Sequence, residues 1–257
     1  MANAQLISKP SGYYLYITVY VPLIKEDKPE NIEQALVDMN VTGLDAGIAN
    51  NMTSDDGRTW KWSFEESERL KKAQRKNDEY RKWHKRKYGY ERNSNAQLKI
   101  IHREYEKLDN RKQEAINQFK HEMLGDGGLV AIQDEQVKQW ASDPSFSGEV
   151  HHSILGGIMA VLKDSTRTLV VDKWTRTTGV CPECGWVLEH KLSLDERKWT
   201  CPCCHAEHDR DQASAQINRL LAVLQATGGL PSEYGELLVN RLNVLMGCGA
   251  LTLIRQL

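Results

Sequence analysis

The chain has 257 residues, of which 40% are hydrophobic and 27% are charged, and its formal net charge at pH 7 is −1. These values are typical of a globular protein with one large domain or one domain that carries insertions. The chain has no apolar run of about 18 residues, which excludes a membrane-spanning helix. The near-neutral charge would argue against a nucleic-acid-binding protein if the charges were evenly spread, but they are not.

The first 40 residues predict a strand and a connector. Residues 12–20 (GYYLYITVY) are aromatic and β-branched, as β-strands commonly are. Residues 24–40 are acidic and contain a proline, which favours a connector with a short helix.

Residues 41–62 predict three antiparallel strands. The first is a buried strand that ends at Asp45, the second runs through Met52, and the third runs through Trp62. The pair Asp56-Gly57 is typical of the hairpin turn between the second and third strands. An aspartate on the first of three antiparallel strands indicates the opening of an RNase H-like fold.

From Glu65 to Met123 the apolar pattern is helical, with a turn at residues 93–95 that separates two helices. The second helix carries apolar residues at three- and four-residue spacing, which predicts a coiled-coil-like seam. The seam comprises Leu98, Ile101, Tyr105, Leu108, Ala115, Phe119 and Met123.

The first of these helices is strongly basic. Residues 69–92 carry eleven Lys or Arg against three acids, with aromatic residues between them. Such a charge run is usually a solvated helix face whose aromatic side chains pack on a partner helix. Because the charges are nearly all of one sign, we favour contact with a nucleic-acid backbone, with rings free to stack on bases. The candidate contact residues are Lys71, Lys72, Arg75, Lys76, Arg81, Lys82, Trp83, Lys85, Arg86 and Lys87.

Residues 129–174 follow the order strand, helix, strand. An apolar segment, LVAIQDEQVKQW, runs into acids, a helix follows over 149–165, and RTLVVDKW forms the next strand. This order predicts parallel pairing through a right-handed crossover. Trp174, Thr177 and Thr178 come directly after the second strand and are candidates for lining a groove that binds a nucleic-acid strand.

Two Cys-x-x-Cys pairs follow, with sixteen residues between them. They consist of Cys181, Cys184, Cys201 and Cys204. The spacing predicts a zinc ribbon, in which each pair lies on a tight turn and a hairpin brings the pairs together. A hairpin of this length buries too little apolar surface to fold alone, so structural Zn²⁺ is expected. Cys203 is an alternative ligand, but Cys204 keeps the two-residue spacing. Disulfides are disfavoured because the N-terminus does not resemble a signal peptide, so a reducing, cytoplasmic compartment is expected.

Acidic residues stand where strands end or a helix begins. They are Asp45, the group Gln133-Asp134-Glu135, and Asp211. Sites in open sheets form at the carboxyl ends of parallel strands, where the first two lie. Three converging carboxylates would repel one another unless cations lay between them, which suits two hard cations that promote phosphodiester cleavage. Each acid alone has an ordinary explanation, such as a helix cap for Asp211.

Three segments carry a family resemblance: GLDAGIAN at 43–50, AIQDEQVKQW at 131–140, and CPECG…WTCPCCHAEHDRD at 181–211. They resemble the three RuvC motifs and the zinc ribbon of the TnpB family, the OrfB-type transposon proteins related to compact type V CRISPR effectors. The resemblance extends from about Tyr13 to about Leu224. It implies an α/β fold with an RNase H-like (RuvC) mixed sheet, an inserted basic helical hairpin and an inserted zinc ribbon. It also implies Mg²⁺-dependent DNA cleavage guided by a bound RNA.

The resemblance further implies that Asp45, one acid of residues 133–135, and Asp211 bind the catalytic metals. The common second motif has glutamate where this chain has Gln133, whereas a variant form places it at Glu135. Alternate residues of a strand share a face, so we choose Glu135 over Asp134. The third motif has Ala213 where the family usually has asparagine, which weakens the expected support of the metal site.

By the same resemblance the chain divides into six parts. They are the end of a wedge-like region with a connector (1–40), the first RuvC part (41–64), the helical hairpin (65–125), the second RuvC part (126–180), the zinc ribbon (181–206), and the third RuvC part with C-terminal helices (207–257). The family carries long wedge and recognition domains upstream, and this chain begins near their end. A second protein subunit that supplies them, or a homodimer mate, is therefore an expected partner, together with guide RNA and target DNA.

Two functions remain in competition at the level of sequence. The first is a RuvC endonuclease module with two Mg²⁺ ions at Asp45, Glu135 and Asp211. The alternative is a catalytically silent module that binds guide RNA or DNA and assembles with, or regulates, a full-length nuclease. The substitutions at Gln133 and Ala213 favour the alternative slightly, whereas the three available acids oppose it.

Overall fold

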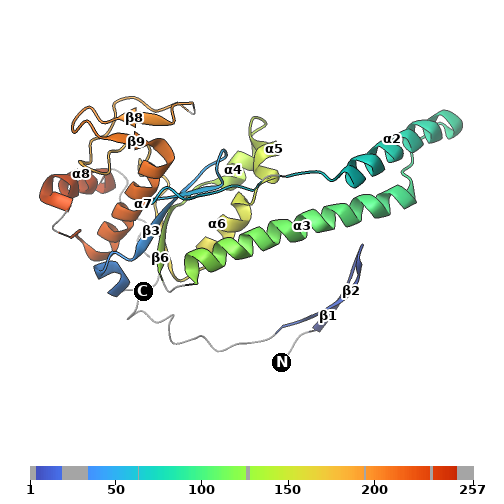
Figure 1. The fold of residues 1–257 in the computed structure, drawn as a ribbon, viewed down its shortest axis with the longest axis horizontal. Coiled ribbons are helices and arrows are strands. Elements are labelled where there is room, and N and C mark those ends of the chain that lie inside the picture. The colour runs from blue at the N-terminus through green and yellow to red at the C-terminus, as the bar shows by residue number, and fades with distance from the viewer. Residues whose placement is uncertain are drawn as a thin grey trace. The chain divides into compact units, whose positions relative to one another are not determined.

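The computed structural model describes residues 4–18, 34–62, 64–125, 128–193, 195–231 and 234–247 (Figure 1). The chain divides into two compact units, one from residues 1–23 with 63–115 and one from residues 24–62 with 116–257. Most of the predicted connector, residues 24–33, lies outside the described residues. Its last part forms a helical turn at residues 34–37.

The first unit contains a β-hairpin and a pair of helices. Strands β1 (Ala4–Lys9) and β2 (Gly12–Ile17) pair antiparallel, so the strand predicted over 12–20 is present through Ile17, and residues 19 and 20 lie outside the described residues. The helices are α2 (Glu68–Tyr88) and the larger part of α3 (Asn95–Leu124). Ser67 caps the start of α2, and Gly89 ends it at a φ of +83°, a conformation that glycine adopts without a side-chain clash.

The face of α2 opposite its charges is buried, at Leu70, Ala73, Asn77 and His84. The apolar seam predicted on α3 is wrong at Tyr105, which is exposed. Its neighbour Glu104 is buried instead, because the Ser67 hydroxyl and the Lys107 ammonium donate hydrogen bonds to its carboxylate. A polar contact therefore takes the place of an apolar one at this turn of the helix.

The second unit is built on a five-stranded mixed sheet in the order β5-β4-β3-β6-β7. The strands are β3 (Val41–Ala46), β4 (Met52–Ser54), β5 (Thr59–Trp60), β6 (Leu129–Gln133) and β7 (Thr168–Val171). Strands β3, β4 and β5 pair antiparallel, and β6 and β7 pair parallel, as the sequence pattern predicts. Strand β3 also pairs parallel with β6. The second strand begins rather than ends at Met52, since residues 47–51 form a bend.

Helix α7 (Arg210–Thr227) lies directly on β3 (Figure 1). A Cβ atom on Gly43 would lie 2.0 Å from the Ala215 carbonyl oxygen, so only glycine permits this approach. The buried Asn218 amide also donates a hydrogen bond of 2.9 Å to the Leu44 carbonyl. These two contacts fix the start of α7 beside the carboxyl end of β3.

The core lies between the sheet and α7. All of β6 is buried, and its alternate residues Leu129 and Ala131 join the apolar cluster formed with α7. The C-terminal helix α8 (Gly235–Gly247) contributes Leu238 and Leu242 to the same cluster. Burial of both faces of β6 explains why its sequence reads as a continuous apolar run.

Two predicted segments differ in the structure. Residues expected to extend the second-motif strand form a short helix, α4 (Val137–Ser142). The single helix predicted over 149–165 is divided into α5 (Ser147–His151) and α6 (Leu155–Lys163). The buried Ser153 hydroxyl donates to the Val150 carbonyl and accepts from the Leu155 N–H, which ends one helix and starts the next.

The cysteine-rich segment forms two turns and a small hairpin. Strands β8 (Lys198–Thr200) and β9 (Glu207–Asp209) pair antiparallel, and Val180 forms a β-bridge with Val187. Within the described ranges, no helix has the length and hydropathy that a bilayer span requires.

Candidate metal centres

The four cysteines of the two Cys-x-x-Cys pairs meet at one point. Among the residues that the structure describes, Cys181, Cys184, Cys201 and Cys204 are the only group of three or more His, Cys, Asp or Glu with ligand atoms all within 4.8 Å of one another. The Sγ–Sγ distances are 3.5 Å for Cys181–Cys204 and 3.7 Å for Cys184–Cys201. A tetrahedral Zn²⁺ with sulfur ligands at about 2.3 Å requires sulfur separations of about 3.8 Å. The donor set and its dimensions therefore fit structural Zn²⁺.

The two cysteine turns have the same backbone design. The Gly185 N–H bonds to the Cys181 carbonyl at 2.8 Å, and the His205 N–H bonds to the Cys201 carbonyl at 2.9 Å. Gly185 has a φ of +70° and His205 a φ of +60°. The second turn thus places a histidine in the left-handed conformation for which the first turn uses glycine.

Burial makes the free thiolate unfavourable at two of the four cysteines, Cys181 and Cys184. It raises the pKa of the Cys181 thiol, and it raises the pKa of Cys184 to about 12. A bound dication would reverse this effect, since zinc coordinates thiolates rather than thiols. His208 lies beside the cluster, with its Nε2 3.2 Å from the Cys181 Sγ and its ring 4.8 Å from that of Trp199.

Cys203, the alternative ligand in the second turn, does not belong to the cluster. It is exposed, and the Arg241 guanidinium of α8 lies 3.7 Å from its Sγ. Arg241 also donates to the Cys184 carbonyl at 2.8 Å and stacks over the Trp186 ring. The preference for Cys204 thus agrees with the geometry, and α8 supports both turns through one arginine.

The predicted catalytic acids stand at the carboxyl edge of the sheet and at the start of α7. Asp45 lies one residue before the end of β3. Burial raises the pKa of its carboxyl well above the ordinary value, and the charges of Asp211 and Glu135 raise it further. The charges of Asp211 and Glu135 therefore both act on Asp45. The described part of the chain does not, however, draw their oxygens into a compact cluster like that of the cysteines.

Asp211 is not the helix cap that was its ordinary explanation. The cap is Asp209, whose carboxylate accepts hydrogen bonds from the N–H groups of Asp211 and Gln212. The Asp211 carboxylate is buried and is held by two arginines. Arg197 donates to it at 2.7 Å from the loop before β8, and Arg210 donates to it at 3.0 Å. The sequence pattern gave no indication of these two ion pairs.

At the second motif the strand ends at Gln133, so strand alternation does not extend to Glu135 as the sequence argument assumed. Other observations separate the two acids. Asp134 forms an ion pair with Lys163 of α6. Glu135 is half-buried, and burial raises the pKa of its carboxyl, with a further contribution from the charge of Asp134.

The Gln133 side chain has a structural role that sequence reasoning missed. Its amide is buried, donates to the carbonyls of Asp172 and Thr175, and accepts a hydrogen bond from the Thr177 hydroxyl. A glutamate at this position has no N–H group to donate. The departure from the common second motif therefore secures the loop that follows β7.

The basic residues predicted for nucleic-acid contact lie on the exposed side of α2. Lys71, Arg81 and Lys85 form ion pairs with neighbouring acids at the surface. The exposed Trp83 ring carries the Lys87 ammonium 5.1 Å from its centroid. The predicted side chains are thus on one helix, with an aromatic ring among the cations.

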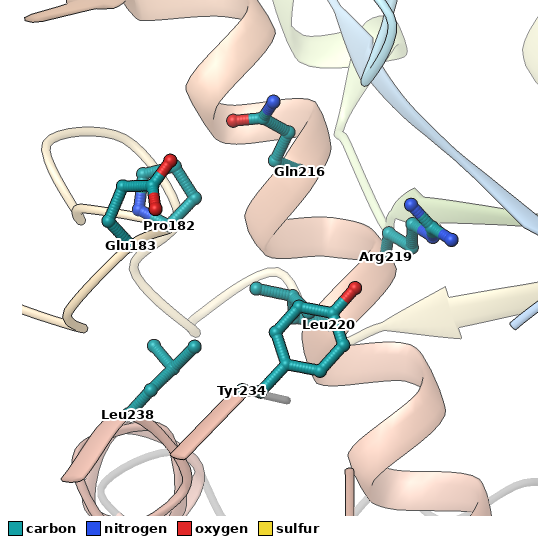
Figure 2. Close-up of a pocket in the computed structure, with 7 residues that line it drawn as sticks. All are labelled: Pro182, Glu183, Gln216, Arg219, Leu220, Tyr234 and Leu238. Atoms are coloured by element: carbon teal, nitrogen blue, oxygen red, sulfur yellow. The ribbon is translucent and has the colours of Figure 1, made fainter. Parts of the chain in front are cut away.

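A cavity in the second unit lies between the first cysteine turn, α7 and α8 (Figure 2). It has a volume of about 310 Å³ and is lined by Pro182, Glu183, Gln216, Arg219, Leu220, Tyr234 and Leu238. Arg219 donates to the Asp55 carboxylate and the Met39 carbonyl, and Gln216 donates to the Asp55 carbonyl. Two polar side chains of the cavity, Gln216 and Arg219, therefore hold α7 against the segments that carry Met39 and Asp55.

Comparison with known proteins gives one family match. Residues 161–217 match the family model described as the Cas12f1-like TNB domain. The matched span runs from the end of α6 through β7 and the cysteine cluster into α7, so it contains Asp211 but neither Asp45 nor Glu135. No curated protein matches the chain. Residues 161–217 are accordingly assigned as a Cas12f1-like TNB domain with a four-cysteine cluster, and through this domain the chain is related to the Cas12f and TnpB proteins.

Proposed function

We propose that this chain is the RuvC-type, Mg²⁺-dependent endonuclease module of an RNA-guided complex that targets DNA. The observation that carries the proposal is the electrostatic state of Asp45. Its carboxyl is desolvated at the end of a central strand, and two further acids from distant segments raise its pKa. Mutually destabilising carboxylates at one edge of a sheet are a frequent property of sites that bind hard cations.

The sheet order supports the same proposal. Three antiparallel strands followed by two parallel ones, with the first acid on the central strand, agree with an RNase H-like RuvC fold. In this fold class the carboxyl ends of the parallel strands form the site. The TNB domain supports the relation to nucleases that act on nucleic acids.

Asp45, Glu135 and Asp211 would hold the metal ions. Two Mg²⁺ ions supply an activated water and stabilise the leaving oxygen in phosphodiester cleavage. In the structure, Lys163 pairs with Asp134 and the charge of Glu135 raises the pKa of Asp45, which supports Glu135 as the second-motif acid of the site. Arg197 and Arg210 pair with Asp211. Asp45, Glu135 and Asp211 are together called the acid edge. Arg197 belongs to the TNB domain, so it connects the zinc ribbon to the acid edge.

The basic face of α2 would follow a phosphate backbone of guide RNA or target DNA. Its cations are exposed on one helix, and multiple phosphate contacts give affinity that falls steeply with salt. A second protein subunit, or a second copy of the chain, would be the protein partner in this complex.

One observation favours a second candidate function, that of a catalytically silent module that binds guide RNA or DNA. Asp211 is already neutralised by two arginines, and Gln133 serves a loop rather than a metal. In a regulator of a full-length nuclease, acids in this arrangement would be inherited from a nuclease and would have no catalytic role.

Cleavage assays on the co-purified complex separate the two candidates. The chain is expressed beside its native flanking DNA, bound RNA is sequenced, and single-stranded and double-stranded DNA are offered with Mg²⁺. We expect a defined RNA and Mg²⁺-dependent cleavage that falls at least about 100-fold in Asp45→Asn, Glu135→Gln and Asp211→Asn. The exposed ribbon variant Glu189→Gln serves as the matched control. Equal cleavage by Asp211→Asn contradicts the proposed site, and bound RNA without cleavage supports the silent module.

A further inference from the structure

The loop between β7 and the first cysteine turn presents one large aromatic side chain to solvent. Trp174 is 78% exposed, whereas Thr175 and Thr177 beside it are each 3% exposed. The loop is therefore not loosely packed as a whole. One indole projects from a segment whose next residues are buried.

Hydrogen bonds hold the loop in this form. The Gln133 amide donates to the Thr175 carbonyl at 2.6 Å and to the Asp172 carbonyl at 3.1 Å. The Thr177 hydroxyl donates to the Gln133 side-chain oxygen at 3.0 Å. The backbone N–H of Trp174 donates to the Asp172 carboxylate at 2.8 Å, which closes the turn locally. Trp174 thus stands between anchors on both sides.

The loop begins at the same edge of the sheet as the acids. Gln133 is paired in register with Val171, and Gly43 is paired with Ala131, so Asp45 lies level with Gln133. Asp172, the first residue of the loop, comes directly after Val171, which is level with Gln133 and Asp45. With strand separations of about 4.8 Å, β7 runs about 10 Å from the strand that carries Asp45. A strand of nucleic acid bound at the acid edge would pass close to the loop.

The charge beside the ring suits a nucleic acid. The Lys173 ammonium lies 5.0 Å from the centroid of the Trp174 ring, and both side chains are exposed. The other cation of the loop, Arg176, donates inward to the carbonyls of Thr178 and His190. The loop therefore offers solvent a flat ring and one ammonium group, which match a base and a neighbouring phosphate.

We propose that Trp174 is a stacking platform for an unpaired base of a single-stranded substrate, and that Gln133 is the positioning residue that holds the platform at the acid edge. The proposal rests on the proposed nuclease function and assigns to it a contact with the substrate strand. Because the loop is already fixed, little conformational entropy is lost when the base stacks. This role explains why residue 133 is a glutamine, because its side-chain N–H groups donate hydrogen bonds to carbonyls of the loop.

A fluorescence experiment tests the platform without cleavage. Zinc-loaded chain in an Asp45→Asn background is titrated into oligo(dT) strands with one 2-aminopurine placed at successive positions. We expect the probe to be quenched at one or two neighbouring positions. Trp174→Ala should abolish that quenching and weaken binding roughly 5- to 100-fold. Trp174→Phe, which keeps a ring, should restore part of both, and Leu237→Ala, an exposed apolar residue on α8, should change neither.

The positioning role has its own readout. Gln133→Glu, and Thr177→Val as a second and milder variant, should reduce the position-specific quenching. Both should leave the salt dependence of binding unchanged, because neither changes a phosphate contact. Quenching that is the same in Gln133→Glu and Thr177→Val as in the parent overturns the role of Gln133.

The outcomes separate this inference from the proposed function. Salt-dependent binding of the oligonucleotide with quenching that does not depend on Trp174 overturns the platform and leaves the nuclease proposal standing. Absence of any binding by the parent chain overturns both. If Trp174→Ala keeps full oligonucleotide binding but loses a co-purified protein, the ring is a protein contact and the inference is wrong.

Discussion

The cysteine cluster and the acid edge are two candidate metal centres of opposite construction. The four sulfurs come from one segment of 24 residues, 181–204, and lie within 4.8 Å of one another. The acids come from β3, the end of β6 and the start of α7, and their oxygens are not gathered in this way. Burial raises the pKa in both centres, at the Cys181 thiol and at the Asp45 carboxyl.

The difference lies in what neutralises each centre. The four sulfurs of the cysteine cluster are spaced to hold one dication between them. At the acid edge, side chains of Arg197 and Arg210 already pair with Asp211. From this difference we expect the ribbon site to need its metal to fold, and we propose that the acid edge folds with internal cations and exchanges some of them for metal.

The largest effect is expected when a zinc ligand of the ribbon is removed. Cys204→Ser is expected to lose stoichiometric zinc and to unfold the two turns, because zinc binding contributes about 10–16 kcal/mol in comparable small modules. Cys203→Ser, its neighbour, is expected to keep the zinc. Zinc content by mass spectrometry and thermal unfolding distinguish the two. Retention of zinc by Cys204→Ser but not by Cys203→Ser would show that the ligand set is wrong.

The acid edge is expected to make the zinc-loaded chain less stable as pH rises when Mg²⁺ is absent. The pKa of Asp45 is raised in the folded state, so its contribution to stability is complete below the ordinary value of 3.8 and is lost as pH rises through the folded value. The loss for one proton is at most about 1.4 kcal/mol per pH unit. Asp45→Asn should remove this part of the slope.

Urea unfolding of the zinc-loaded chain across pH 5–8, compared between the parent and Asp45→Asn, measures it. The comparison cancels the titration of the cysteine ligands, which both proteins share. Parallel stability curves would mean that Asp45 is ordinarily solvated and that the electrostatic argument is wrong.

Arginine and metal should compete for Asp211. Arg197→Gln removes a cation that lies 2.7 Å from the carboxylate, so Mg²⁺ should bind more tightly, by roughly ten-fold or about 1.4 kcal/mol. The increase in melting temperature with Mg²⁺ concentration measures this, and the exposed neighbour Lys198→Gln is the control. Weaker Mg²⁺ binding in Arg197→Gln would show that the arginine organises the site instead of competing for it.

The smallest expected effect concerns the two cysteine turns. His205 has a φ of +60° where the first turn has Gly185, and a non-glycine residue in this conformation costs about 1–2 kcal/mol. His205→Gly should therefore stabilise the zinc-loaded ribbon by about 0.5–1 kcal/mol after the entropic cost of glycine. Gly185→Ala should act oppositely, since its Cβ would lie 2.9 Å from the Arg241 Cβ. Urea unfolding in excess zinc measures both.

Local patterns predicted the ribbon and much of the sheet. The spacing of Cys181, Cys184, Cys201 and Cys204 fixes their meeting point because each pair needs only a tight turn. The order strand, helix, strand predicted the parallel pairing of β6 and β7 because such crossovers have few solutions. The break between α5 and α6 was not predictable, since it depends on the single hydroxyl of Ser153.

The acid edge was only partly predictable. The sequence identifies the candidate acids, but tertiary contacts decide their state. The capping role of Asp209 and the ion pairs of Asp211 need the three-dimensional arrangement of β9, α7 and the loop before β8. Strand alternation favoured Glu135 over Asp134, but the strand ends two residues before Glu135. The choice of Glu135 now rests on the ion pair that Asp134 forms with Lys163.

Binding of Mn²⁺ in place of Mg²⁺, followed by electron paramagnetic resonance on the zinc-loaded chain, tests the central claim most directly. The account predicts that Mn²⁺ binds in the parent and in Glu189→Gln, and that binding is lost in Asp45→Asn and in Asp211→Asn. Equal Mn²⁺ binding in all four proteins would contradict it, because the acid edge would then not be the metal site.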